Sequence, residues 1–184
     1  VFNDGSNDVD FRVESNGNAN MLFVDGGNDA VGIGTAAPDS TLEIAAGPPR
    51  LKLTRNNTAS TGNDFGRIVF ENSAGTILSR IDCESTSGNT QSALTFSNGG
   101  SERLRLDSSG RLLVGTTTEG HADAANLTVA DTSDCGITIR SGASDFGSIY
   151  FSDATSGSGE HAGYIDYSHS NNSMRIGTNE STRL

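Results

Sequence analysis

The chain has 184 residues, of which only 33% are hydrophobic and 6% aromatic, and its formal net charge is −11. With 12 basic and 23 acidic side chains, it is not expected to bind nucleic acid, whose phosphates are held by Lys and Arg, or to be drawn to an anionic membrane surface. An ordinary globular domain carries roughly 45–50% apolar residues, so a self-sufficient core is not expected here.

The apolar residues fall in short alternating runs separated by turns, a pattern typical of strands and not of a disordered chain. The turns draw on 23 glycines and on many Ser, Thr, Asn and Asp residues. No stretch keeps its apolar residues at the helical period, so little helix is expected. Ordered strands with little core favour obligate oligomerisation, in which partner chains supply the missing burial.

The first predicted module spans residues 1–49 and is partial. Its expected strands are 9–14, 21–24, 31–34 and 41–44, and its expected turns are 4–8, 15–18 and 25–29. Gly32 and Gly34 alternate with β-branched residues, which indicates the close approach of another backbone. The run Gly47-Pro48-Pro49 marks the end of the module.

The second predicted module spans residues 50–125. Its expected strands are 51–53, 67–71, 77–83, 93–96, 103–106 and 112–114. Alternation places Ile77, Ser79, Ile81 and Cys83 on one face of their strand, and Leu78, Arg80 and Asp82 on the other. In residues 103–106, alternation predicts that both arginine side chains point outward if both leucine side chains point inward. Residues 107–110 have the chemistry of a hairpin turn.

The third predicted module spans residues 126–184 and is expected to be truncated. Its expected strands are 127–129, 137–139, 148–151, 162–167, 174–176 and 183–184. The loop 152–160 is long and rich in Gly and Ser. Both ends of the chain are expected to continue into a longer protein.

The modules repeat one another in sequence. Residues 64–70 return as 145–151, with Asp-Phe-Gly at the start of both, and residues 101–104 return as 181–184. Residues 22–25 and 31–35 are echoed by 104–107 and 112–116. Recurrence at a fixed period indicates an array of one β-module, and arrays usually build length or surface and not a single reaction centre.

Candidate chemical sites are weak in this sequence. His121, His161 and His169 have no spacing that brings them to one metal ion, and Cys83 and Cys135 have no neighbouring Cys or His cluster. The acidic turns 4–8 and 25–29 resemble pieces of a calcium loop but lack its closing Glu, so a turn role is favoured.

The repeated pair Asp64 and Asp145 is likewise expected in turns, because a catalytic dyad rarely recurs with its whole surrounding strand. No catalytic, metal-binding or cofactor-binding residue is therefore assigned, no cofactor and no enzyme activity are expected, and the receptor-binding residues stay unassigned. No apolar run predicts insertion into a membrane.

Four stretches, 9–15, 22–25, 31–35 and 101–116, resemble the repeats of tailed-phage fibre proteins, especially those of marine and cyanobacterial phages. The resemblance implies a trimeric, β-rich rod on the virion, of a kind that often carries a receptor-binding tip. Some members end in a self-cleaving chaperone domain, which is not visible in this sequence. The resemblance carries over no catalytic residue.

Together these observations predict an all-β fold, an elongated array of hairpin and meander modules of about 80 residues, in an intertwined homotrimeric rod of the β-prism or triple β-helix type. The expected function is a structural segment of a phage tail fibre that serves host attachment or its mechanical support. The expected partners are further copies of the chain, other tail or baseplate proteins, and a host-surface glycan or protein. The expected location is the virion, outside the cell.

Two alternatives remain open. The same module could build a bacterial extracellular adhesin or filament. A polysaccharide-degrading tailspike would need a long parallel β-helix and a carboxylate groove, which the short hairpin-like strands disfavour.

Overall fold

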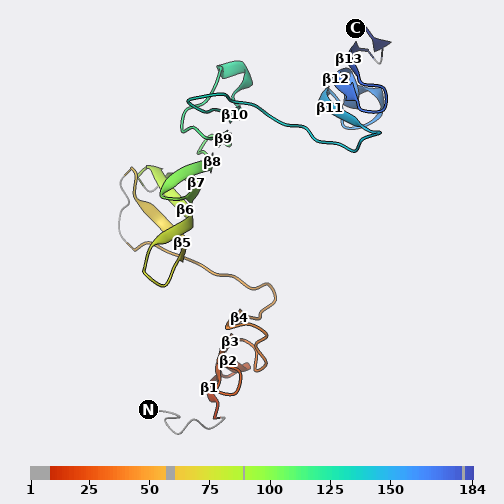
Figure 1. Ribbon diagram of the computed structural model, residues 1–184. Helices are drawn as coiled ribbons and strands as arrows, with labels where there is room; N and C mark the ends of the chain where they lie inside the picture. Colours follow the sequence, from red (N-terminus) through yellow and green to blue (C-terminus); the bar gives the residue numbers. More distant parts are fainter. Residues whose placement is uncertain (1–8, 57–60, 89, 180) are drawn as a thin grey trace. The chain divides into compact units, whose positions relative to one another are not determined.

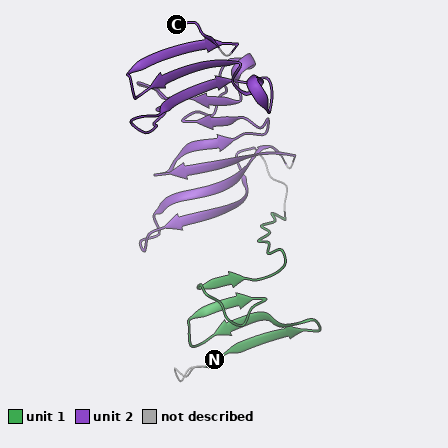
Figure 2. Ribbon diagram, turned by 90° about the vertical axis from the view of Figure 1, so that its right-hand side faces the viewer, with its two compact units in different colours: residues 1–59 green, residues 60–184 purple. Residues whose placement is uncertain are grey.

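The computed structural model describes residues 9–56, 61–88, 90–179 and 181–184. It is all-β, with 46% strand and 5% helix in three open sheets, which confirms the predicted class and the scarcity of helix (Figure 1). The helices of the described residues are two short 3-10 turns, η1 (Ala122–Ala124) and η2 (Gly157–His161). The chain divides into two compact units, residues 1–59 and 60–184 (Figure 2). No helix in the described part is long and apolar enough to cross a membrane.

Sheet 1 lies in the first unit. Its strands are β1 (Phe11–Ser15), β2 (Asn18–Asp25), β3 (Ala30–Ile33) and β4 (Leu42–Ile44), which neighbour one another in that order. The first three strands are antiparallel, whereas β4 runs parallel to β3. Asp25 shapes the turn after β2, because its carboxylate accepts the N–H groups of Gly27 and Asn28.

Sheet 2 has six strands, which neighbour one another in chain order. They are β5 (Asp64–Glu71), β6 (Ile77–Ser87), β7 (Gln91–Asn98), β8 (Ser101–Leu106), β9 (Leu112–Val114) and β10 (Leu127–Val129). All neighbours are antiparallel except β9 and β10, which are parallel. Asp107 shapes the turn between β8 and β9 by accepting the N–H groups of Ser109 and Arg111, which confirms the predicted hairpin.

Sheet 3 is antiparallel throughout. Its strands are β11 (Phe146–Phe151), β12 (Gly163–Ser168), β13 (Ser173–Thr178) and β14 (Ser181–Thr182), again in chain order. The repeat seen in the sequence is also a repeat in register. Ile68 of β5 pairs with Ile81 of β6, and the equivalent Ile149 of β11 pairs with Ile165 of β12.

The shorter echo in the sequence is a structural repeat as well. Gly34 and Gly115 end strands β3 and β9 at positive φ, +86° and +73°. A Cβ at Gly34 would overlap the carbonyl oxygen of Ala45, and one at Gly115 would overlap that of Ala130. The close backbone approach predicted around Gly34 is thus confirmed, and it occurs twice because both parallel crossovers use the same turn.

Two predicted strands are absent, and the one predicted at 183–184 is replaced by β14 at Ser181–Thr182. Residues 51–53 and 137–139 alternate as strands do, yet neither segment is a strand in the structure. A strand is defined by hydrogen bonds to a neighbour, and these segments make no backbone hydrogen bond to a strand within the described part of their own chain. The prediction from alternation was therefore wrong at these two places.

The core is small, as the composition predicted. Among the described residues, the buried apolar side chains are Phe23, Ala30, Ala93, Leu113, Ala125 and Tyr164. Two of these six are large aromatic rings and three are alanines, so most of the larger apolar side chains lie elsewhere. Their arrangement on the sheets provides the candidate site.

Candidate assembly surface

Sheet 2 has two faces of opposite chemistry. Residues that pair across strands share a face, and one such row crosses all six strands without a polar side chain: Ile68, Ile81, Phe96, Leu104, Val114 and Val129. A second row on the same face contains Gly66, Cys83, Leu94, Leu106, Leu112 and Leu127. We call these two rows the apolar face of sheet 2.

The opposite face is largely polar. Its central row contains Arg67, Asp82, Thr95, Arg105, Leu113 and Thr128. The burial of the two faces is inverted relative to an ordinary sheet. Asp82 and Thr95 are 2% and 3% exposed, whereas Ile68 and Leu106 are 46% and 44% exposed. Exposed apolar surface costs about 25 cal/mol per Å², so this face is unfavourable for a chain on its own.

The arginines of the polar face are held by carboxylates. Asp82 binds Nε of Arg80 at 2.6 Å through one oxygen, and its other oxygen lies 3.2 Å from Nε of Arg67. Arg67 also contacts Asp64. A nearly buried carboxylate needs such pairing, because an isolated charge loses its hydration. The pairing explains how this face tolerates a charge at the centre of the sheet.

Arg105 lies at the centre of a second group of charges. Its guanidinium binds Glu102 at 2.6 Å and Glu84 at 3.2 Å. The hydrogen bond to Glu102 raises the pKa of Arg105 above its usual value. The expected order of exposure holds for Arg103, which is exposed, and Leu104, which is half-buried. It is reversed at the next pair in the single chain, since the Arg105 side chain is only 14% exposed and Leu106 is much more exposed. A polar hollow of about 180 Å³ lies among these paired charges.

Sheet 3 repeats this division. Ile149, Ile165 and Ile176 form one apolar row, and Ile149 is 47% exposed. On the opposite face, Asp166 is buried and binds Nη2 of Arg175 at 2.7 Å. The guanidinium of Arg175 also stacks over the ring of Phe146, 4.4 Å from its centroid. The charge pair therefore forms within the sheet, although Oδ1 of Asp166 and Nε of Arg175 have no hydrogen-bond partner among the described residues.

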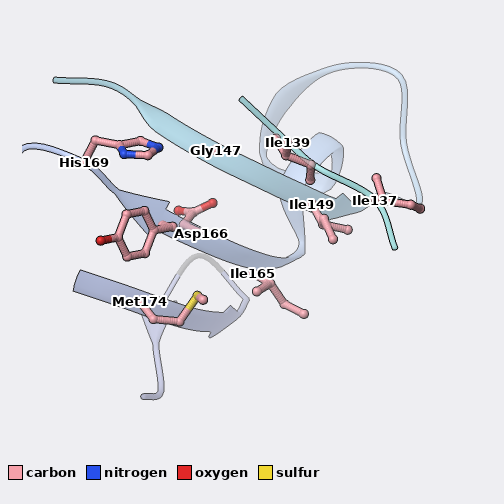
Figure 3. A pocket seen from close by; sticks show the side chains of 9 residues that line it. Ile137, Ile139, Gly147, Ile149, Ile165, Asp166, His169 and Met174 are labelled. Atoms are coloured by element: carbon pink, nitrogen blue, oxygen red, sulfur yellow. The ribbon is translucent and has the colours of Figure 1, made fainter. Parts of the chain in front are cut away.

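A hollow of about 280 Å³ opens on the apolar face of sheet 3 (Figure 3). Its apolar lining includes Ile149, Ile165 and Met174 from the strands, together with Ile137 and Ile139 from the segment that is not a strand. Ile139 lies close to β11. Its Cγ2 atom is 3.5 Å from the position that a Cβ at Gly147 would occupy. The segment thus rests partly on the sheet.

Sheet 1 has the same arrangement on a smaller scale. One apolar row, Phe11, Val24, Val31 and Leu42, crosses all four of its strands. Leu42 is 59% exposed, whereas Phe23 on the opposite face is buried. Arg12 and Glu14 form an ion pair at 2.5 Å. All three sheets therefore present an apolar face that their own chain leaves largely uncovered.

The three histidines each interact with a different residue and not with one another. His121 accepts the N–H of Asp123 at η1, His161 packs edge-on to Tyr150, and His169 packs edge-on to Tyr167. Within the described ranges, no group of three or more His, Cys, Asp or Glu side chains is placed to hold a metal ion.

The remaining candidate residues lie in turns, in an ion pair or as free thiols. The turn 25–29 uses Asp25 for backbone hydrogen bonds, and the turn 4–8 lies outside the described residues. Asp64 pairs with Arg67, and the N–H of Asp145 closes a turn to Gly142. Cys83 is a half-buried free thiol on the apolar face of sheet 2, and Cys135 is exposed and free. The structure does not bring these groups together into one site.

Sequence reasoning missed the continuous apolar rows, although each strand alternated visibly. The alternation gives two faces to each strand, but only register shows that six apolar residues line up across the sheet. No family model and no curated protein matches the chain.

Proposed function

We propose that this chain is a structural segment of a homotrimeric phage tail fibre, serving host attachment or its mechanical support. The observation that carries the proposal is that each of the three sheets leaves its apolar face uncovered. The opposite face of each sheet carries charges that are already paired. Such sheets gain stability when other copies cover the apolar faces. The trimeric state and the fibre come from the sequence resemblance, and the uncovered faces supply the physical need for self-association.

The exposure of the apolar rows supports an obligate assembly. Leu42 of sheet 1, Ile68 of sheet 2 and Ile149 of sheet 3 are 59%, 46% and 47% exposed. Contiguous apolar patches of this kind on a soluble chain usually mark an interaction surface.

The array also fits a role in building length. The same register and the same glycine turns recur along the chain, and no catalytic group recurs with them in the described part. Repeated modules stack or associate through equivalent surfaces. The net charge of −11 keeps such an assembly soluble and disfavours nucleic acid as its partner.

Size-exclusion chromatography with light scattering on the 184-residue chain tests the assembly. The expected mass is about three times 19.1 kDa at micromolar concentration. A folded, stable monomer would overturn the proposal.

Immunogold labelling tests the location. Antibodies raised against the chain are expected to mark the tail fibres of virions whose genome encodes it. Labelling of a bacterial cell surface in the absence of phage would instead support the adhesin.

A further inference from the structure

Two segments of the chain have strand sequences but no strand partner among the described residues. Residues 51–54 read Leu-Lys-Leu-Thr and residues 137–140 read Ile-Thr-Ile-Arg. Each precedes an Asp-Phe-Gly run, so they occupy the same place in successive modules. Alternating aliphatic and polar residues with β-branched side chains favour a pleated strand. Their recurrence indicates that the pattern has a structural purpose.

The backbone of these two segments is available for pairing. Among the described residues, no backbone hydrogen bond joins either segment to another part of the chain. Leu51 and Ile137 are each 70% exposed. Strand-forming sequence with free N–H and C=O groups is a template for pairing with another chain.

The segment 137–140 is already placed for such pairing. Ile137 and Ile139 lie beside Ile149 on the apolar face of sheet 3 (Figure 3). In a strand, side chains stand perpendicular to the direction of the backbone hydrogen bonds. A strand whose isoleucines rest on the sheet therefore offers its N–H and C=O groups sideways, parallel to the sheet surface, where a second strand can join it.

We infer that residues 51–54 and 137–140 are strands that pair with another copy of this chain, forming a second β-layer over the apolar faces. This inference rests on the proposed self-assembly and adds the segments that perform it. A single strand is too narrow to cover an apolar face of several strands, as the open hollow beside Ile137 shows. Additional copies supply equivalent strands, which extend the layer.

Charge complementarity favours a copy of this chain as the partner. Arg50, Lys52 and Arg55 place three of the 12 basic residues around the first segment, and no Asp or Glu lies between residues 44 and 63. The rest of the chain is strongly acidic. A basic segment is therefore attracted to the acidic body of another copy, which assists the encounter.

Proline substitution in the full 184-residue chain tests the inference. Thr138→Pro removes one N–H that has no backbone partner in the described part of the single chain, so it should affect only the intermolecular layer. Lys52→Pro combined with Thr138→Pro disrupts both proposed strands.

Ala143→Pro is the matched control. Ala143 is exposed and directly follows Gly142, the first residue of the turn that the Asp145 N–H closes onto the Gly142 carbonyl. The second position of such a turn accepts proline, because the ring fixes φ near the value that the turn requires. The control therefore adds a proline near the proposed strand without touching it.

The readouts are mass by light scattering and amide hydrogen exchange. Thr138→Pro is expected to weaken association by about tenfold or more, the double variant to be more severe, and Ala143→Pro to assemble as the unmodified chain does. In the unmodified assembly, amides 137–140 should exchange at least about a hundredfold more slowly than in an unstructured peptide. This second measurement holds even if a proline variant fails to fold.

The outcomes separate the two proposals. An unmodified chain that is a folded monomer overturns both. An unmodified chain that assembles while its 137–140 amides exchange as in a peptide, or a double proline variant that assembles normally, overturns the strand inference and leaves the fibre proposal standing.

Discussion

Asp82 and Asp166 occupy the same position in two different sheets. Each is buried on the polar face of the second strand of its repeat, and each pairs with an arginine. The cross-strand arginine comes from opposite sides. Asp82 has Arg67 on the preceding strand, whereas Asp166 has Arg175 on the following strand. Each carboxylate thus keeps a cross-strand arginine, although the arginine lies on the preceding strand in sheet 2 and on the following strand in sheet 3.

Removing either carboxylate should destabilise its sheet. Asp82→Asn and Asp166→Asn keep the side-chain shape but remove the carboxylate partner of Arg80 and of Arg175, and Asp82→Asn leaves Arg67 with Asp64 alone. We expect a loss of about 1–3 kcal/mol for each, moderated because the arginines are partly exposed, with Asp82→Asn the larger since two arginines depend on it. Urea denaturation measures the change. Asp123→Asn, at a side chain 93% exposed, is the control and should be nearly neutral.

Two adjacent residues on β11 test which face assembles. Phe151 and Tyr150 are 59% and 58% exposed and lie on opposite faces, Phe151 on the apolar one. Phe151→Asp should weaken self-association about tenfold or more, because it places a charge in the buried layer. Tyr150→Asp should leave the assembled mass unchanged. Equal effects of the two substitutions in light scattering would contradict the assignment of the faces.

The repeated glycine turns should not accept a side chain. Gly34→Ala and Gly115→Ala each force a Cβ onto a backbone carbonyl at positive φ, and we expect about 2–4 kcal/mol of destabilisation for each. Gly110→Ala separates the two causes, since its φ is +78° but the space around it is open. It should cost only about 1–2 kcal/mol. Thermal unfolding of the three variants side by side provides the comparison.

Acid should destabilise the hairpin turn at Asp107. Burial of this carboxylate raises its pKa, but hydrogen bonds from Arg111 and Ser109 outweigh it, and the pKa lies below its usual 3.8. Because the folded state lowers the pKa, the stabilisation is present above 3.8 and is lost as the pH falls through the lower folded value.

Asp107→Asn keeps the acceptor oxygen without the charge. Its urea midpoint should therefore fall less steeply than that of the unmodified chain between about pH 5 and about pH 2. Identical slopes for the two chains would show that Asp107 does not contribute to the acid sensitivity.

The sequence by itself determined the local features of this protein. The all-β class, most strand positions and the turns at Asp25 and Asp107 were predictable, because side-chain period and turn chemistry depend on neighbours within a few residues. The repeat was visible for the same reason. Glycine in 31–34 even indicated the close backbone contact that Gly34 makes with Ala45.

Only the tertiary structure decided how these elements combine. Register aligned the apolar rows and placed Arg105 on the more buried face and Leu106 on the exposed one, the reverse of the expected order. It also revealed that 51–53 and 137–139 have no strand partner within the described part of the chain. Hydrogen-bond pairing and burial belong to pairs of segments that lie far apart in sequence, so no local pattern contains them.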